Sequence, residues 1–453
     1  MISNAPNMKT DQENAMIHGR EGRLLTALKA YNSQLSRAEL KEKYGKMAMS
    51  PFIFYRGTAH LFWMDFQWDW RLTTFGSYRT RTWLNADCHT DNFGAFSEDG
   101  VGIVYGLNDF DESIVADYQY DLWRLAVSLI LVADQNGGFS RKDKDVLLDA
   151  LASGYLKSLL KFAGNKKAEK AVHTSKNTRG ELKKFLLKTE KKESRGKMLQ
   201  KWTTTNRKGQ EVFDQKNPKL KRLRVVDKEK IARGILRYIK TTQSDIEFGE
   251  NYFNVLDVAR RASAGTGSLG VDRYYVLIEG GSGKSHDNVI LDVKEEPRPS
   301  AYPYASMEQK QLYRKYFPTE GIRFVTAYRA LSFHPDDHLG YFNMDNKSFG
   351  VRERNPWKNA LPTDKLKDVK RFSEMADQWG HILAAEHARG SKITNYKLAK
   401  EVKKLMKKKK LKVKDFQRVV RDVAHGYAEV VYNDYGYFMK HLAPDLDPVP
   451  KEK

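Results

Sequence analysis

The sequence predicts an α+β protein of two lobes, one rich in β-strands and a larger one that is mostly helical. Helical periodicity dominates both ends of the chain, in residues 20–49 and from residue 372 to about residue 442. Short β-like segments lie between them, in residues 251–264, 271–280 and 288–294. With 453 residues, 40% of them hydrophobic, the chain is long enough for two or three compact units.

Composition and periodicity divide the chain into four segments. Residues 1–156 form the first part of the helical lobe and include an apolar stretch at 121–134 that predicts a buried helix. Residues 157–230 are rich in lysine and have few core-forming positions, which favours a basic helical insertion. Residues 231–356 hold the β-like segments, and residues 357–453 return to helix.

Positive charge is in large excess, with a net charge of +22 and a pI near 9.6. Much of this excess lies in residues 157–230 and 400–414. Solvated helical faces and loops are the simplest interpretation of such lysine-rich stretches. Nucleic acid is a compatible partner, but the stretches lack the interleaved aromatic residues of single-strand binders, so it is not indicated.

Three observations favour a cytoplasmic protein without a membrane partner. The longest apolar stretch, residues 125–133, is far too short to cross a bilayer. The N-terminus is polar and has no apolar signal core. Cys88 is the only cysteine, which excludes a disulfide within the chain and fits a reducing compartment.

A glycine-rich turn lies between two of the β-like segments. Gly265, Gly267 and Gly270 make the pattern G-x-G-x-x-G, and Ser268 lies within it. Because the turn leaves one strand and enters another, it is similar to the hairpin that covers the ATP phosphates in kinases. Glycine lets backbone amides approach phosphate oxygens closely. Taken alone, the pattern is explained more simply by an ordinary hairpin turn.

Lys294 lies on the next β-like segment, where a kinase has the lysine that binds the α- and β-phosphates. Side-chain alternation puts Ile290, Asp292 and Lys294 on one face of the strand and three aliphatic residues on the other. A lysine on an apolar strand can also extend toward solvent. Its place directly after the hairpin favours phosphate binding.

A polar cluster in WLNADCHTDNFGAF, residues 83–96, supplies the candidate catalytic residues. Asp87 and Asn92 are five positions apart, as are the catalytic aspartate and the metal-binding asparagine of a kinase catalytic loop. An aspartate in this place would accept or orient the proton of an attacking hydroxyl group. A turn capped by Asp and Asn side chains is the alternative.

A second acidic motif follows a short β-like run and contains Asp109 and Asp111. A kinase places the metal-binding aspartate of its D-F-G motif at the corresponding point. Together with Asn92, these two aspartates are candidate oxygen ligands for Mg²⁺, which shields the phosphates during transfer. The catalytic motifs here precede the glycine turn, whereas in ordinary kinases they follow it. The β-rich lobe would then be inserted after part of the helical lobe, as in a circular permutation.

Five segments resemble, in this order, signatures of a mainly bacterial family catalogued as domain of unknown function 2252 (DUF2252): MAMSPFIFYRGTA, NADCHTDNFGAF, LNDFDESIVADYQYDLWRLAVS, ASAGTGSLGVDRYYVLI and ILDVKEE. The resemblance covers residues 43–134 and 231–439. Members of this family look like distant relatives of aminoglycoside phosphotransferases and protein kinases, and their glycine loop also follows the catalytic motif. The resemblance therefore implies a protein-kinase-like, two-lobed fold with permuted motif order.

The resemblance also implies roles for individual residues. Asp87 matches the catalytic aspartate, Asn92 and Asp109 match metal ligands, and Lys294 matches the phosphate-binding lysine. Asp121 matches the aspartate that supports the catalytic loop from a helix.

His89 falls within a family signature and is a further candidate catalytic residue. The sequence departs from the family at two points. Ala86 stands where the family usually has glycine directly before the catalytic aspartate. The glutamate that would pair with Lys294 is open between Glu308 and Glu320.

These features predict an ATP- and Mg²⁺-dependent phosphotransferase that acts on an unknown acceptor, with transfer of a phosphoryl or a nucleotidyl group. A nucleotide-binding pseudoenzyme or scaffold without turnover is the main alternative. A metal-dependent hydrolase that uses Asp87, His89, Asp109 and Asp111 as ligands is a third.

Overall fold

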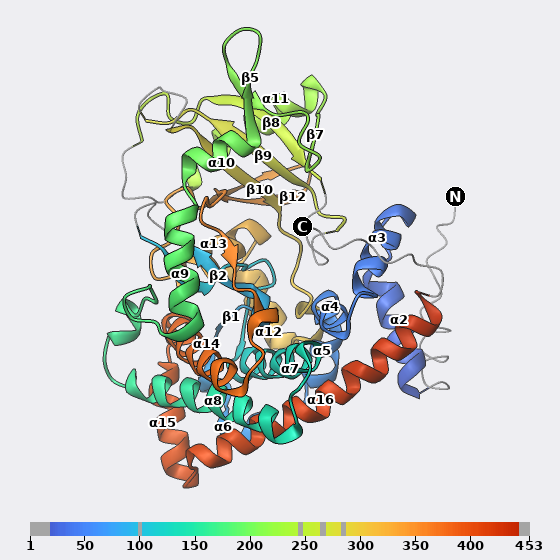
Figure 1. The fold of residues 1–453 in the computed structure, drawn as a ribbon, viewed down its shortest axis with the longest axis vertical. Helices are drawn as coiled ribbons and strands as arrows, with labels where there is room; N and C mark the ends of the chain where they lie inside the picture. The colour runs from blue at the N-terminus through green and yellow to red at the C-terminus, as the bar shows by residue number, and fades with distance from the viewer. Residues whose placement is uncertain (1–18, 98–101, 243–247, 263–268, 282–286, 444–453) are drawn as a thin grey trace.

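The structure is a computed structural model that describes residues 19–97, 102–242, 248–262, 269–281 and 287–443. A six-stranded antiparallel sheet lies at one end of the molecule and most of the helices lie at the other (Figure 1). The fold is thus a mixture of helices and strands, as the α+β class predicts. Within these ranges no helix combines the length and the apolar character that a bilayer span requires.

The helical part is built around α14 (Val369–Gly390), which packs along α8 (Arg141–Lys161). The long helix α16 (Val413–His441) contacts both α8 and α7 (Gln119–Asn136), the helix predicted at residues 121–134. Helix α7 is buried on nearly all sides because most of its residues from Leu122 to Ala133 are apolar. The other α-helices of the described ranges are α2 (Gly19–Tyr31), α3 (Arg37–Met47), α4 (Pro51–Gly57), α5 (Ala59–Phe66), α6 (Leu72–Phe75), α9 (Gly180–Lys192), α10 (Arg195–Trp202), α11 (Val225–Tyr238), α12 (Met307–Tyr316), α13 (Glu320–Leu331) and α15 (Leu398–Lys409).

The single helix expected at residues 20–49 is wrong, because two helices, α2 and α3, meet there at a break. The Asn32 amide binds the carbonyl of Leu28 and ends the first helix. Ser36 then caps the second helix in a capping box with Glu39, whose side chain accepts from the Ser36 amide at 2.9 Å. The cap residues override the helical period.

The six-stranded sheet has the order β11-β12-β10-β9-β8-β7, with every neighbouring pair antiparallel. Strands β8 and β9 form the hairpin predicted around the glycine turn, and β10 carries Lys294. Residues 340–344, which the sequence pattern did not indicate as a strand, form the edge strand β11. The strands are β7 (Leu220–Lys221), β8 (Val255–Arg261), β9 (Arg273–Ile278), β10 (Val289–Glu295), β11 (Gly340–Met344) and β12 (Lys347–Glu353).

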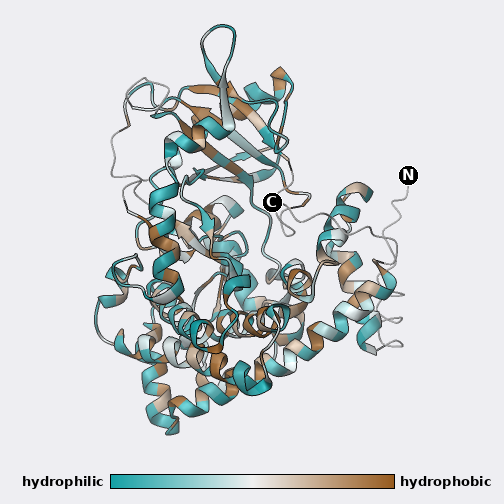
Figure 2. Cartoon of the chain, in the orientation of Figure 1, coloured by the Kyte–Doolittle hydropathy of each residue, from teal (hydrophilic) through white to brown (hydrophobic). Residues whose placement is uncertain are grey.

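Each face of this sheet has its own hydrophobic cover, and brown residues alternate with teal and pale ones in its strands in Figure 2. Helix α11 packs on the face that carries Val289, Leu291 and Val293. Helix α10 and the hairpin of β5 (Thr203–Thr205) and β6 (Glu211–Phe213) pack on the other face, where Trp202 contacts Tyr275. The predicted alternation along β10 is confirmed, because Val289, Leu291 and Val293 belong to one cluster and Ile290 belongs to the other.

Residues 157–230 differ from the helical insertion that the sequence predicts. They contain β5, β6 and β7 as well as α9 and α10, and β7 joins the edge of the main sheet. Helix α9 packs on α14, whereas α10 packs on the sheet. The segment therefore connects the helical part to the sheet by direct packing.

Two small antiparallel ribbons lie between the sheet and the helices. In one, β1 (Arg81–Leu84) pairs with β4 (Ile114–Asp117). In the other, β2 (Phe93–Phe96) pairs with β3 (Val104–Leu107), and β13 (Asn359–Ala360) adds a third strand. The connections β1–β2 and β3–β4 both cross from one ribbon to the other, so these two loops must lie side by side.

Gly380 permits the close approach of α14 and α8, and this generates a prediction. A Cβ atom at Gly380 would collide with the backbone of Leu151 and would lie 2.6 Å from the amide nitrogen of Tyr155. We expect Gly380→Ala to lower the free energy of unfolding by about 1–3 kcal/mol in chemical denaturation, as overpacking does elsewhere.

Gly426 provides the matched control, because it also lies within a helix, α16, but has open space around its Cα. Gly426→Ala should raise stability by up to about 1 kcal/mol through helix propensity alone. Equal effects of the two substitutions would contradict the proposed packing of α14 on α8.

Candidate functional site

The two loops between the ribbons bring the acidic motifs together. The first loop (residues 85–92) and the second loop (residues 108–113) are joined by a backbone hydrogen bond from Asn108 to the carbonyl of Asn92, 3.1 Å long. A pocket of about 120 Å³, here called the loop pocket, lies against both loops. Its lining includes the following residues predicted from the sequence: Asp87, His89, Asn92, Asp109, Asp111 and Lys294. The two loops and strand β10, which are about 180 residues apart in the chain, thus meet in one cavity.

Asp121 anchors the first loop from the start of α7. Its carboxylate accepts hydrogen bonds from the backbone amides of Asn85, at 2.7 Å, and Ala86, at 2.9 Å. One carboxylate oxygen also lies 3.1 Å from Nε2 of His387, whose Nδ1 is 2.9 Å from the hydroxyl of Tyr155. Because Asp121 is only 1% exposed, this network is shielded from water and fixes the loop backbone.

Ala86 adopts a backbone conformation that favours glycine. Its φ is +66°, and its carbonyl accepts a hydrogen bond of 3.0 Å from the indole of Trp63. A left-handed conformation costs an L-residue roughly 1–2 kcal/mol. The hydrogen bonds on both sides of Ala86 hold it there, which explains the preference for glycine that the family signature implies.

Asp87 is held by a buried guanidinium group. Arg124, one helical turn after Asp121, donates from Nε to Oδ1 of Asp87 at 2.9 Å and is fully buried. Burial alone would raise the pKa of Asp87, but Arg124 and His89 outweigh it and hold that pKa below the usual 3.8. Asp87 is therefore ionised, with one oxygen engaged by Arg124 and the other directed toward His89.

His89 faces Asp87 as a neutral imidazole. Its Nδ1 accepts a hydrogen bond of 3.2 Å from the amide of Asp91, which leaves the proton on Nε2, 3.7 Å from Oδ2 of Asp87. Burial lowers the pKa of His89, and Asp87 only partly offsets this effect. The neighbouring Cys88 is buried, and burial raises the pKa of its thiol well above the usual value, so no thiolate is expected here.

Asn92 and Asp109 present oxygen atoms suited to a hard cation. The amide nitrogen of Asn92 donates to the carbonyl of Asp87 at 2.8 Å, so the Asn92 carbonyl oxygen remains as a ligand. Burial disfavours the charge on Asp109, but Lys294, Lys358 and other nearby cations lower its pKa to about 2. Asp109 is therefore a carboxylate at any physiological pH.

Lys294 pairs with Asp111, and not with either glutamate considered from the sequence. The two side chains form an ion pair at the edge of the loop pocket, where each is less than one-sixth exposed. Glu320 instead accepts from Arg323 at 2.7 Å, and Glu308 is exposed on α12. The expectation that Glu308 or Glu320 is the partner is wrong, because the second loop brings Asp111 closer to the lysine than either helix does.

The glycine turn lies only partly within the described residues. Gly265, Gly267 and Ser268 fall outside them. Gly270 has φ +83° and packs against Leu35, which lies between α2 and α3. The next residue, Val271, lines the loop pocket, so this end of the hairpin reaches the same cavity as Lys294.

A second cavity, here called the basic cavity, adjoins the second loop beneath the sheet. It has a volume of about 240 Å³, and its lining includes Asn108, Arg273, Arg352 and Lys358. Burial, reinforced by the positive charge of Arg352, lowers the pKa of Lys358 to about 7. The lysine side chain is still accessible to water within the cavity. Positive charge thus dominates this side of Asp109.

Several functional residues escaped the sequence analysis. Arg124 stands three positions after Asp121, and this helical spacing was a signal that it faces the first loop. His387 also supports Asp121, but its place in the sequence, 266 residues after Asp121, gave no signal of this contact. Arg352 and Lys358 had no local signal, because their place depends on strand pairing between distant segments.

One group of ligand-type side chains lies outside the loops. Asp336, His338 and Glu353 have donor atoms within 4.8 Å of one another, the only such group of His, Cys, Asp and Glu among the described residues. Its carboxylates already accept hydrogen bonds, including one from the Glu353 amide to Asp336 at 2.6 Å and one from Arg195 to Glu353 at 2.9 Å. These contacts explain the group as a structural link between β12 and the preceding turn.

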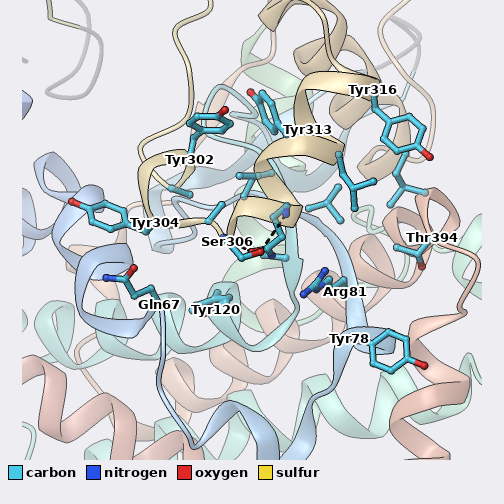
Figure 3. Close-up of a pocket in the computed structure, with 18 of the residues that line it drawn as sticks. Gln67, Tyr78, Arg81, Tyr120, Tyr302, Tyr304, Ser306, Tyr313, Tyr316 and Thr394 are labelled. Carbon is cyan, nitrogen blue, oxygen red and sulfur yellow. Dashed lines mark hydrogen bonds between the residues drawn. The ribbon is translucent and has the colours of Figure 1, made fainter.

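A third pocket, of about 330 Å³, is rich in aromatic side chains (Figure 3). Tyr78, Tyr302 and Tyr316 point toward it from three separate segments, and Arg81 lies at its base in Figure 3. Trp63 lines this pocket as well as binding the Ala86 carbonyl, so one side chain links the aromatic pocket to the first loop. The lining suits a ligand with an apolar or aromatic body.

Glu386 supports the strand that leads into the second loop, and its titration can be tested. It accepts a hydrogen bond of 3.1 Å from the Leu107 amide, and burial raises its pKa to about 7. The pKa of Glu386 is higher in the folded protein than in the unfolded chain. The protonated carboxyl group therefore contributes to the stability of the fold at low pH, and this contribution is lost as the pH rises toward 7. Relative to wild type, Glu386→Gln should gain roughly 2–3 kcal/mol in free energy of unfolding between pH 4.5 and pH 8.

Chemical denaturation at several pH values measures this difference. Glu308→Gln, at an exposed position on α12, serves as the control and should follow the wild-type curve. A constant difference between Glu386→Gln and wild type across this range would show that the carboxyl group is not perturbed by burial.

Comparison with known proteins yields a family. The profile of DUF2252, described as "Uncharacterized protein conserved in bacteria", matches residues 36–441. No curated protein and no solved structure matches the chain. Because the profile covers most of the 453 residues, the chain belongs to the DUF2252 family.

Proposed function

We propose that the protein is a Mg²⁺- and ATP-dependent transferase of a kinase-like kind. The observation that carries this proposal is the loop pocket, in which Asp87, Asn92, Asp109 and Lys294 line one cavity. Phosphate transfer requires these groups together, because a hydroxyl must be oriented, a metal must be held and phosphate charge must be neutralised.

Asp87 would orient the hydroxyl group of the acceptor. Its lowered pKa makes it a weak base, so its main contribution is the position of its free oxygen rather than strong proton abstraction. Arg124 fixes the carboxylate in one orientation, and the neutral imidazole of His89 lies beside it. Because Arg124 and His89 flank the carboxylate, an acceptor hydroxyl can reach it only from the loop pocket.

Asn92 and Asp109 would hold Mg²⁺, which shields the phosphate charge when bound. The side-chain oxygen of Asn92 and the carboxylate of Asp109 are hard ligands of the kind that Mg²⁺ prefers. Lys294 would bind the phosphates in exchange for Asp111. The ion pair holds the lysine at the edge of the loop pocket, and Asp111, once exchanged for phosphate, would be a further candidate metal ligand.

The arrangement around Lys294 supports a kinase-like nucleotide-binding lobe. The lysine lies on β10, the third strand counted from the start of the hairpin, and two helices, α12 and α13, follow that strand before β11. Helix α13 also contacts the second loop, since Arg323 donates to the carbonyl of Ser113 at 3.1 Å and Tyr328 packs on Phe110. Motion of this helix would therefore move the metal-binding loop.

A nucleotide-binding pseudoenzyme is the second candidate, and the Lys294–Asp111 pair favours it. A lysine engaged by the metal-binding loop, without a glutamate partner from a helix, is an arrangement that could bind a nucleotide without turnover. The hydrolase alternative has less support. Asp87, His89, Asp109 and Asp111 do not bring three ligand atoms within 4.8 Å of one another in the described part of the chain.

The proposal predicts that Asp87→Asn and Asp109→Asn each lower Mg·ATP turnover by at least about 100-fold, as the loss of an essential proton-orienting or metal-binding group does. Asparagine is the appropriate replacement at position 87, because alanine would leave the buried Arg124 without its partner. Nucleotide turnover should be followed by product analysis, and folding by thermal unfolding.

Asp364→Asn is a matched control, since Asp364 is exposed and remote from both loops in sequence. It should retain full turnover. Wild-type activity in Asp87→Asn or Asp109→Asn would exclude the proposed mechanism. Nucleotide binding without turnover in the wild-type protein would favour the pseudoenzyme.

A further inference from the structure

The face of the sheet that carries Lys294 is strongly charged beyond the loop pocket. Register determines this, because Lys294 is paired with Arg273 of β9, and Asp292 is paired with Arg352 of β12. Directly paired residues of antiparallel strands share a face. These side chains therefore share one face: Lys294 lines the loop pocket, and Arg273, Asp292 and Arg352 line the basic cavity.

The acidic residues of this cavity are already paired. Asp292 accepts from Arg273 at 2.7 Å, and Glu353 accepts from Arg195 at 2.9 Å. Asp336 lies 3.4 Å from the ring nitrogen of His338. None of the acidic side chains in the lining is left to neutralise the remaining cations.

Four basic side chains in the same lining form no salt bridge within the described residues: Arg261, Arg352, Arg354 and Lys358. The buried Nε atoms of Arg261 and Arg354 also lack a hydrogen-bond acceptor. Arg354 stacks on Trp202 at 4.5 Å, which orients its guanidinium group without neutralising it. The cavity is thus a set of oriented donors with excess positive charge.

The positive charge of the basic cavity favours the phosphates of a nucleotide over its base. A neutral base placed here would remove water from several unpaired cations without compensation, which is costly. Phosphate oxygens instead accept charge-assisted hydrogen bonds from guanidinium and ammonium groups. A volume of about 240 Å³ is also adequate for a short chain of phosphates.

We propose that the basic cavity binds the terminal phosphates of the nucleotide, so that the α-phosphorus faces Asp87 and the protein transfers a nucleotidyl group. This inference rests on the proposed function and specifies its reaction. The second loop borders both cavities, because Asp109 lines the loop pocket and the preceding residue, Asn108, lines the basic cavity. A triphosphate that passes Asp109 with its end in the basic cavity presents the phosphorus nearest the nucleoside to the loop pocket.

The loop pocket has a surface for the nucleoside in this orientation. Tyr31 and Val271 line it, and Tyr31 is 42% exposed while its ring stacks on His60 at 3.9 Å. The Nζ of Lys43 also lies over this ring, 5.0 Å from its centroid, so the nucleoside would contact the exposed part of Tyr31.

The reaction balances without a further reactant. The acceptor oxygen forms a bond to the α-phosphorus, and the bond from that phosphorus to the oxygen bridging to the β-phosphate breaks. Pyrophosphate leaves with the electron pair, beside the cations of the basic cavity. The acceptor proton passes to Asp87 or to water.

Product analysis with water as the acceptor tests the inference directly. The full-length protein is incubated with Mg²⁺ and ATP, and AMP, ADP, phosphate and pyrophosphate are quantified over time. AMP and pyrophosphate in equal amounts are expected, and their loss in Asp109→Asn would assign them to this site. ADP and phosphate, lost in the same variant, would overturn nucleotidyl transfer and leave the proposed function standing.

Pyrophosphate binding provides an independent measurement. Lys358→Ala removes one of several basic side chains near Asp109, while Lys294, Arg352 and Arg273 remain, so we expect it to fold normally and to weaken binding of Mg²⁺-free pyrophosphate by about 10-fold or more. Lys365→Ala, at an exposed lysine nearby in the sequence, should bind like wild type. Titration calorimetry measures both affinities.

Product analysis and pyrophosphate binding together distinguish a failure of this inference from a failure of the proposed function. If no product forms, pyrophosphate binding that weakens in Lys358→Ala would still support the phosphate subsite and would count against turnover. If wild type does not bind pyrophosphate, or if Lys358→Ala binds it equally well, the basic cavity is not a phosphate subsite and the inference is wrong.

Discussion

The buried carboxylate of Asp121 is the contact on which the candidate site depends. It binds two consecutive backbone amides of the first loop and a histidine from α14, so it joins three distant segments at one point. Helix α7, which carries Asp121, also supplies Arg124, and Arg124 orients Asp87. Loss of this carboxylate would leave buried amides without acceptors and would release Ala86 from its left-handed conformation. Loop geometry is thus set by helix α7 rather than by the loop itself.

The crossing of two short ribbons explains why the motifs meet. Strands β1 and β4 pair, as do β2 and β3, so the two connecting loops cannot separate without breaking both ribbons. The sheet places Lys294 against the second loop, where it pairs with Asp111. Acidic groups lie mainly in the loops and basic groups on the sheet, which suits a ligand that carries both metal and phosphate.

Local sequence patterns predicted a large part of this arrangement. The hairpin, the strand of Lys294 and its alternation, and the buried helix α7 follow from periods of two and 3.6 residues, which neighbouring residues alone determine. The candidate residues of the two loops were also identified from their spacing. The partner of Lys294 and the charged face were not, because Asp111 and Arg352 reach their places through pairing between segments far apart in the chain. Cap residues around Ser36 were visible in the sequence but were outweighed by the apolar period.

Residues 157–230 have a mechanical consequence for the whole molecule. Helix α9 rests on the helices, helix α10 and strand β7 belong to the sheet, and a few residues around Glu193 join them. The indole of Trp357 donates to the carbonyl of Glu193, so even this joint is tethered. Any rocking of the sheet over the loops must bend the chain at this joint. The lysine-rich segment thus joins the sheet to the helices, and the hydrogen bond at Glu193 restrains the bend between them.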